Sequence, residues 1–216
     1  MSAFERQVSL LASCGIKVPA WRLAHTLAEA QAAGRSLSFP LVVKAAPELV
    51  MHKTELGLVH LNLREPSELE QAFQDVHSKL PGAAVLVQEM VQEVVEVLLA
   101  MRHDSDFGAI AAIGGGGVLV ELLEDVTYLP LPASPGEFLA ALRELRVWRL
   151  LSGYRGREPR DVEALVTAAS KLGDAYLASQ PTIGELEINP LAVLATGGGV
   201  AALDILELSR PEGRGI

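Results

Sequence analysis

The chain has 216 residues, half of them hydrophobic, which suits one large domain or two small lobes and argues against disorder. Its formal net charge of −9 argues against nucleic acid as the main partner, because neutralising a phosphate backbone needs clustered lysine and arginine. The single cysteine, Cys14, excludes a disulfide within the chain. With no leader-like start and no long apolar run, we expect a cytoplasmic protein with no membrane partner.

Helix starts are marked by capping boxes, in which Ser or Thr is followed three residues later by Glu. These pairs are Ser2–Glu5, Thr26–Glu29, Ser67–Glu70 and Ser134–Glu137. Pro135 follows the last of these serines and suits the first position of a helix, where its missing N–H costs nothing. A longer helix is predicted over residues 159–178.

Apolar runs between these helices predict strands over residues 41–44, 84–88, 94–101, 109–113, 118–122, 183–189 and 200–206. Because helices and strands mix throughout and several strands are close enough in sequence to form hairpins, we expect an α+β fold rather than a doubly wound parallel sheet. A boundary near Val91 would divide the chain into an N-terminal lobe, residues 1–90, and a C-terminal lobe, residues 91–216. A ligand would then bind in the cleft between them.

Two of the predicted strands end in residues suited to a nucleotide. Lys44 ends a buried apolar strand, where its ammonium needs either an anion such as phosphate or a path to surface water. A later strand leads into Glu89, Met90 and Val91, whose backbone can meet the edge of an adenine ring. A carboxylate there can accept an N–H or a hydroxyl of the nucleotide, although a solvated glutamate at a strand edge fits the same pattern.

Two loops have compositions that suit phosphate. The first contains His52 and Lys53, followed by Gly57 at a predicted turn. Cationic side chains and backbone N–H groups can cover phosphates, and a histidine can itself accept a phosphoryl group, but an ordinary polar loop has the same composition. The second, Gly114–Gly117, permits close backbone approach either to a phosphate or in a plain turn. It matches neither the Rossmann nor the P-loop pattern.

The C-terminal block predicts a hairpin that places polar groups together. Alternation puts Glu187 and Asn189 on one face of a strand. If the hairpin is centred between Thr196 and Gly197, Asn189 lies directly opposite Asp204, because both are equally far from the turn. An amide oxygen and a carboxylate so placed suit Mg²⁺, which takes few protein oxygens and keeps phosphate and water ligands. A solvated acidic strand face is the alternative.

The order and spacing of these pieces resemble the ATP-grasp domain of ADP-forming acyl-CoA (acetate–CoA) synthetases, relatives of succinyl-CoA synthetase, over nearly the whole chain. The resemblance is carried by Lys44, His52-Lys53, Gln88-Glu89-Met90, Phe107-Gly108, Gly114–Gly117, Gly153-Tyr154-Arg155-Gly156, and Glu187-Ile188-Asn189-Pro190 with Asp204. It implies an ATP-grasp fold, in which two α+β lobes hold the nucleotide in the cleft between them.

The resemblance also implies which residues bind the cofactors ATP and Mg²⁺. The implied contacts to ATP are Lys44 and Arg155 at the phosphates, Glu89 to Val91 at the adenine, and Glu96 at the ribose. Asn189 and Asp204 are implied ligands of Mg²⁺, and Glu187 on the same strand face is a further candidate. Lys53 and Gly57 are candidate phosphate contacts in the loop that contains His52.

His52 resembles the histidine that, in these synthetases, shuttles a phosphoryl group between ATP and a second phosphohistidine on the CoA-binding part. The implied reaction converts an acid, CoA and ATP into acyl-CoA, ADP and phosphate. Because regions for CoA binding and ligation are not apparent in this sequence, a partner subunit is expected to bring CoA and a small carboxylic acid. No nucleic-acid partner is expected.

Three positions depart from the family pattern. Leu58 follows Gly57 where a second glycine is common, Glu55 stands where an Asp is usual, and Leu129 stands where an arginine is frequent. The departures at Gly57-Leu58 and Leu129 favour a first alternative, a nucleotide-sensing module without turnover. A second alternative is an ATP-grasp ligase that forms an acyl phosphate directly. His52 discriminates between the enzymes, because the direct ligase needs no phosphohistidine.

Overall fold

The computed structural model describes residues 3–46, 56–117, 120–179 and 182–209, and the chain divides into two compact units. Unit 1 comprises residues 1–18 and 93–216, and unit 2 comprises residues 19–92. The predicted N-terminal lobe starts at residue 1, but the first 18 residues belong to unit 1. The reason is that β1 (Ile16–Lys17) pairs in parallel with β10 (Val200–Ala202), far along the chain.

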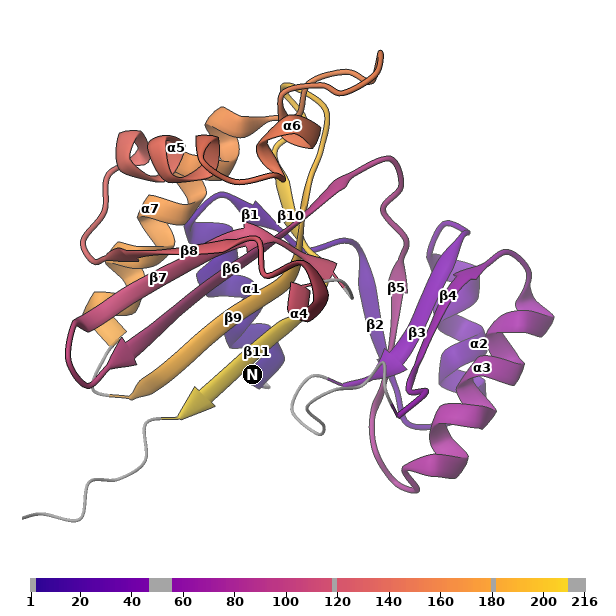
Figure 1. Cartoon of the computed structure of the whole chain (residues 1–216). Coiled ribbons are helices and arrows are strands. Elements are labelled where there is room, and N and C mark those ends of the chain that lie inside the picture. The colour runs from indigo at the N-terminus through magenta and orange to yellow at the C-terminus, as the bar shows by residue number, and fades with distance from the viewer. Residues whose placement is uncertain (1–2, 47–55, 118–119, 180–181, 210–216) are drawn as a thin grey trace, which may run out of the picture. The chain divides into compact units, whose positions relative to one another are not determined.

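Unit 2 is a four-stranded antiparallel sheet with the strand order β2-β5-β3-β4. Its strands are β2 (Trp21–Ala24), β3 (Leu41–Ala45), β4 (Val59–Leu63) and β5 (Val85–Glu89). Two helices, α2 (Leu27–Ser36) and α3 (Pro66–Lys79), pack on one face of this sheet (Figure 1).

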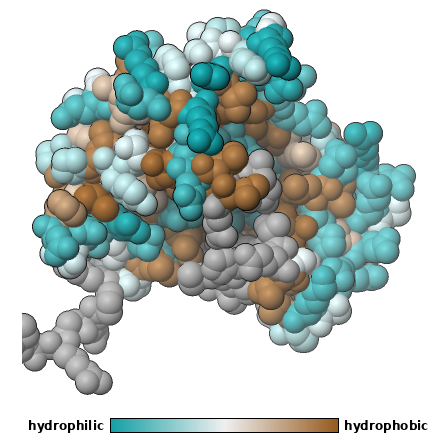
Figure 2. Space-filling view, in the orientation of Figure 1, coloured by the Kyte–Doolittle hydropathy of each residue, from teal (hydrophilic) through white to brown (hydrophobic). Residues whose placement is uncertain are grey.

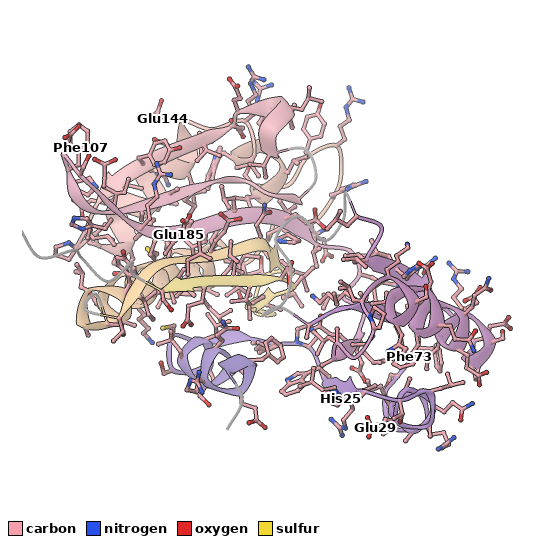
Figure 3. All side chains as sticks on the ribbon, turned by 90° about the horizontal axis from the view of Figure 1, so that it is seen from below. His25, Glu29, Phe73, Phe107, Glu144 and Glu185 are labelled. Carbon is pink, nitrogen blue, oxygen red and sulfur yellow. The ribbon has the colours of Figure 1, made fainter. Side chains whose placement is uncertain are left out.

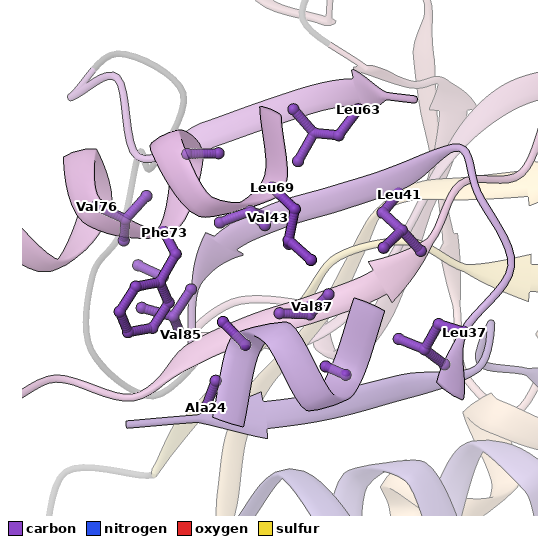
Figure 4. Close-up of a cluster of buried hydrophobic side chains, with 14 of the residues drawn as sticks. Ala24, Leu37, Leu41, Val43, Leu63, Leu69, Phe73, Val76, Val85 and Val87 are labelled. Atoms are coloured by element: carbon purple, nitrogen blue, oxygen red, sulfur yellow. The ribbon is translucent and has the colours of Figure 1, made fainter. Parts of the chain in front are cut away.

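The core of unit 2 lies between that face and the two helices (Figure 4). Leu41 and Val43 of β3 and Val85 and Val87 of β5 belong to it, together with Phe73 of α3. Since side chains alternate across a strand, the residues between these face the opposite side of the sheet. The candidate site residue Lys44 lies on that opposite face.

Two of the predicted helix starts are confirmed, but only the one at Ser134 has the complete capping box. Thr26 caps α2 by accepting a hydrogen bond from the Glu29 N–H, and the Glu29 carboxylate accepts one from the His25 N–H (Figure 3). Ser134 and Glu137 form the complete reciprocal pair at the start of α5 (Pro135–Arg143), with Pro135 in the first turn. Local sequence therefore sets both helix starts.

The capping box predicted at Ser67 is wrong. The helix begins two residues earlier than predicted, at Pro66, so Glu65 takes the cap position. Ser67 lies inside the first turn, where its hydroxyl donates to the Glu65 carboxylate. Proline favours the first helical position, which shifts the start. Glu68, rather than Glu70, reaches back to accept from the backbone N–H four residues before it. The box predicted at Ser2 lies outside the described residues.

Unit 1 is built on a seven-stranded sheet with the order β1-β10-β9-β6-β7-β8, in which β11 also pairs with β9. All pairs except β1–β10 are antiparallel. The remaining strands are β6 (Val95–Asp104), β7 (Gly108–Gly115), β8 (Val126–Pro130), β9 (Ile183–Val193) and β11 (Ile205–Ser209). Its helices are α1 (Ala3–Ser13), α4 (Val120–Leu123), α5, α6 (Trp148–Leu151) and α7 (Val162–Ser179).

Helices α5 and α7 pack on each other and cover one face of this sheet (Figure 1). The predicted strand over residues 118–122 is wrong where it can be compared, because residues 120–123 form the helix α4. A short apolar run fits a strand or a buried helical turn equally, so periodicity could not decide. The strand predicted over residues 200–206 is interrupted at residues 203–204, between β10 and β11.

Among the described residues, no helix is both long enough and apolar enough to cross a membrane.

Candidate nucleotide and metal site

Lys44 in unit 2 is almost fully buried, with 5% of its surface exposed. It lies on the face of β3 opposite the hydrophobic core, beside Val42 and across from Leu86 of β5. The alternative that Lys44 extends to surface water is therefore wrong. A buried ammonium is costly unless negative or polar atoms surround it. The contact of Lys44 with phosphate remains a prediction.

The predicted adenine hinge follows β5 in unit 2. Its position is fixed by two backbone hydrogen bonds, from Glu89 N–H to the Ala20 carbonyl (2.9 Å) and from Met90 N–H to the Pro40 carbonyl (3.0 Å). The Glu89 carboxylate accepts from the Ser38 N–H at 2.8 Å, so one of its oxygens is engaged within the protein. The N–H groups of Glu89 and Met90 are engaged within the protein as well, and the contact of residues 89–91 with adenine remains a prediction.

A hollow of about 270 Å³ lies beside this hinge and is lined by Phe39, Pro40, Arg64 and Gln92. Gln92 directly follows Val91, and Pro40 holds Met90, so the hollow adjoins the hinge backbone.

The loop predicted to cover phosphates is described only from residue 56 onward, so His52 and Lys53 lie outside the described residues. Gly57 has a φ of 63°, which favours glycine. Its carbonyl accepts a hydrogen bond from the Lys79 ammonium at 2.9 Å, and Lys79 also donates to Asp75 at 2.8 Å. This pairing with Lys79 holds the pKa of Asp75 below its ordinary value. The side chains of α3 thus fix the end of the loop.

The register predicted for the C-terminal hairpin in unit 1 is confirmed. Val200 pairs with Val193 on one side of the interruption, and Ile205 pairs with Ile188 on the other. The same count places Asn189 opposite Asp204, and the Asn189 N–H donates to the Asp204 carbonyl at 3.2 Å. Directly opposed residues on antiparallel strands share a face, so the two polar side chains are neighbours.

The glycine loop adjoins this pair within unit 1. The Gly117 N–H donates to Asn189 Oδ1 at 2.9 Å, which orients the amide of Asn189. The Gly116 N–H donates to the Glu96 carbonyl at 3.0 Å, and a Cβ added at Gly117 would collide with the Glu96 carboxylate. Glu96 and Asn189, from two different strands, therefore both contact the glycine loop, and Asp204, between β10 and β11, lies opposite Asn189.

Glu96 is an exposed residue of β6, but partial desolvation of its carboxyl raises its pKa above the ordinary value. A carboxylate that has lost part of its hydration gains most from new hydrogen-bond donors, such as ribose hydroxyls.

The donor set around Asn189 fits a magnesium ion better than a transition metal. Asn189 Oδ1 has a second lone pair beyond the one used by Gly117, and Asp204 adds a carboxylate. Across the described ranges, no group of three or more His, Cys, Asp and Glu side chains is placed to hold a metal. A cation bound by so few protein groups would keep phosphate and water ligands, as Mg²⁺ does. Glu187, two residues before Asn189, is half-buried and remains a candidate.

Arg155 lies in the exposed turn after α6, with its guanidinium over the Tyr154 ring at 5.2 Å. Its φ of 52° and the 92° of Gly153 make this a tight, left-handed turn. Its predicted contact with phosphate stays a prediction.

Sequence reasoning missed Asp125, which is buried and ties the glycine loop to the start of α6. Its carbonyl accepts from the Gly115 N–H at 2.8 Å, and its carboxylate oxygens accept from the N–H groups of Arg146 (2.8 Å) and Val147 (2.7 Å). A Cβ on Gly114 would collide with the Asp125 carbonyl, so glycine is required there. The pattern of apolar residues predicts strands, but it does not indicate that Asp125 contacts two loops that are distant along the chain.

Leu129, one of the departures from the family pattern, is a buried residue of β8 opposite Ala111. Its side chain is part of the packing of unit 1.

The sequence and the fold were compared with known proteins. A family model described as an ATP-grasp domain matches residues 3–206. The chain is 30% identical over 202 residues to the beta subunit of an ADP-forming acetate–CoA ligase II from Pyrococcus furiosus, covering 90% of this chain and 86% of that subunit. It is 33% identical to an ADP-forming acetate–CoA ligase I from Archaeoglobus fulgidus, but spans only 29% of that longer chain.

Among solved structures, one of an acetyl-coenzyme A synthetase from Candidatus Korarchaeum cryptofilum matches with a TM-score of 0.78 and 30% identity, covering 95% of this chain and 91% of that chain. That structure contains coenzyme A and Mg-AMPPCP, and its phosphohistidine segment points towards the nucleotide binding site.

Proposed function

Since this chain belongs to the ATP-grasp domain family, we propose that it is the ATP-binding, phosphoryl-transferring subunit of an ADP-forming acyl-CoA synthetase. The observation that carries the proposal is that Glu96 and Asn189 both contact the glycine loop, while Asp204 lies opposite Asn189. This cluster offers an acceptor for ribose hydroxyls and a pair of oxygens for the magnesium ion of MgATP. The proposal has the support of the subunit relative, most of whose length this chain spans.

The residues on the nucleotide have distinct proposed roles. Lys44 neutralises phosphate charge, and phosphoryl transfer depends chiefly on such positioning and neutralisation. Residues 89–91 hold the adenine through their backbone, and Glu96 accepts from the ribose hydroxyls. Arg155 contacts phosphate. Asn189 and Asp204, with Glu187 as a further candidate, hold Mg²⁺, which when bound offsets the negative charge of the phosphates.

The proposed chemistry begins at His52, with Lys53 and Gly57 of the same loop near the phosphates. A ring nitrogen of neutral His52 forms a bond to the γ-phosphorus while the bond from that phosphorus to the bridging oxygen breaks, and ADP leaves with the electron pair. Histidine with its ordinary pKa near 6.5 is largely neutral at physiological pH. The phosphoryl group then passes to a histidine of the partner, which regenerates His52.

The proposed partner is a CoA-binding chain that also holds the small carboxylic acid. The Korarchaeum synthetase, whose structure contains coenzyme A and a phosphohistidine segment, supports a CoA-binding part in this kind of enzyme. We place the reaction in the cytoplasm, where ATP and CoA are available, and we propose no role for nucleic acid or a membrane.

The first test is phosphoryl labelling. The purified chain is incubated with γ-labelled ATP and Mg²⁺, alone and with candidate CoA-binding chains from the same organism. The expected result is label that is lost in acid, stable in base, absent from His52→Ala and retained in the control His60→Ala. His60 is a suitable control because its ring is held by Asp75 at 2.9 Å in unit 2. Bound ATP without label in any mixture would overturn the relay.

A further inference from the structure

An arginine-rich segment, residues 143–157, stands apart from the rest of this acidic chain. It holds five of the 13 arginines that the chain contains, with Glu144 as its one acidic residue and no lysine. The chain as a whole carries a formal net charge of −9. Such a concentration of positive charge on an acidic protein attracts an anionic partner over a short stretch of surface.

Stacking orders part of this segment. The Arg143 guanidinium lies over the Trp148 ring at 5.6 Å, and Arg155 lies over Tyr154 at 5.2 Å. Each pair leaves its guanidinium on an exposed residue, and Leu150 between the pairs is 44% exposed. The space-filling view shows hydrophobic residues among hydrophilic ones over the end of unit 1 that carries α5 and α6 (Figure 2). Arginine, tryptophan and tyrosine are the residues enriched at energetic centres of protein interfaces.

The segment is also tied to the candidate site. Asp125 accepts from the N–H groups of Arg146 and Val147 and, through its carbonyl, from the N–H of Gly115 in the glycine loop. A Cβ on Gly115 would lie 3.9 Å from the Cβ of Val147, so the segment starts beside that loop. A partner seated on the segment is therefore positioned next to the place where the phosphoryl group is proposed to be handled.

We propose that residues 143–157, apart from Arg155, which the proposed function assigns to the ATP phosphates, form the docking surface for an acidic face of the CoA-binding partner chain. This inference rests on the proposed function, since it names where that partner binds. A protein fits better than a nucleic acid, because one face of each aromatic ring is already covered by an arginine and cannot stack on a base. The acidic remainder of the chain also repels a phosphate backbone.

The test measures the affinity between this chain and the CoA-binding chain by biolayer interferometry, at low and at physiological ionic strength. The variant Arg146→Gln/Arg149→Gln removes two exposed charges of the segment, and the control Arg22→Gln/Arg35→Gln removes two exposed charges of unit 2. We expect the first variant to weaken binding by about tenfold, mainly through the association rate, and to flatten the salt dependence. The control should change affinity less than about twofold. Thermal melting checks that both variants are folded.

His52 labelling of the isolated chain separates the two proposals, because neither variant should alter it. If His52 is labelled but the CoA-binding chain does not bind wild type, or binds both variants equally, the docking surface is wrong and the relay stands. Salt-independent association of wild type would also overturn the docking surface, without relying on a variant. A mixed-sequence single-stranded RNA is the second ligand tested. If it binds wild type as tightly as the CoA-binding chain does, and Arg146→Gln/Arg149→Gln abolishes that RNA binding, the segment is a nucleic-acid surface instead. Absence of His52 label overturns the proposed function itself.

Discussion

Comparing the alanine variants of Gly117 and Gly197 separates the energetic cost of a left-handed backbone from the cost of crowding the nucleotide site. Gly117 has a φ of 78° and Gly197, in the turn of the β9–β10 hairpin, has a φ of 82°. Alanine at either position therefore carries the same backbone penalty. The surroundings differ, because a Cβ at Gly197 meets nothing within 4 Å, whereas one at Gly117 collides with the Glu96 carboxylate.

The shared penalty should lower the free energy of unfolding by about 1–2 kcal/mol in both variants. The obstructing atom at Gly117 is the end of a flexible side chain, so Glu96 moves aside and the unit stays folded. A displaced Glu96 loses its proposed hydrogen bond to ribose. A hydrogen bond to a charged group contributes about 1.5–3 kcal/mol, which corresponds to roughly 10- to 100-fold in the dissociation constant for ATP.

Isothermal titration calorimetry with MgATP, together with urea denaturation, measures both quantities. Gly117→Ala should bind ATP at least about tenfold more weakly than Gly197→Ala, although the two are equally stable. In a Glu96→Ala background the obstruction is gone, so Gly117→Ala should cost no further affinity. Equal dissociation constants for the two glycine variants would refute the placement of Glu96 on the nucleotide.

Three further predictions concern stability and follow from single groups. Desolvation raises the pKa of Glu96 in the folded protein, so the ionised carboxylate lowers the stability above that pKa, and this loss disappears as the pH falls below the pKa of the unfolded state. Glu96→Gln should therefore be more stable than wild type at neutral pH and equally stable in acid. Urea denaturation across pH measures both. Asp125→Ala leaves two backbone N–H groups without their acceptor and should cost about 2–4 kcal/mol, against less than about 0.5 kcal/mol for the neighbouring Glu124→Ala, in thermal melts. Thr26→Ala should cost about 1 kcal/mol through the lost helix cap, whereas Ser67→Ala should cost less than about 0.5 kcal/mol, because Ser67 caps no helix.

Sequence reasoning succeeded where one local rule fixes the geometry. The turn at Thr196 and Gly197 sets the hairpin register, since each strand can only be counted outward from it, and that count placed Asn189 against Asp204. The capping box at Ser134 fixed a helix start for the same reason, because both partners lie within four residues.

Sequence reasoning failed where the structure depends on a contact between residues that are distant along the chain. The membership of β1 in unit 1 depends on pairing with β10, and nothing local in Ile16–Lys17 encodes that partner. The role of Asp125 depends equally on two loops separated from each other along the chain. Four adjacent glycines were compatible with a phosphate loop or a plain turn, and the sequence did not indicate that Gly114 belongs to β7, where only the absence of a side chain lets the Asp125 carbonyl approach.

The order of the elements bears on how the proposed roles are divided. The chain enters the sheet of unit 1 at β1, leaves to build the whole of unit 2, and returns at β6, so unit 2 is an insertion with two connections to unit 1. On the proposed roles, the hinge backbone and Lys44 belong to the insertion, whereas Glu96, Asn189 and Asp204 belong to the unit that receives it. Neither unit then holds the full set of ATP contacts. Loss of Lys44 should accordingly slow phosphoryl transfer more than it weakens adenine binding, because charge neutralisation matters most as charge redistributes in the transition state.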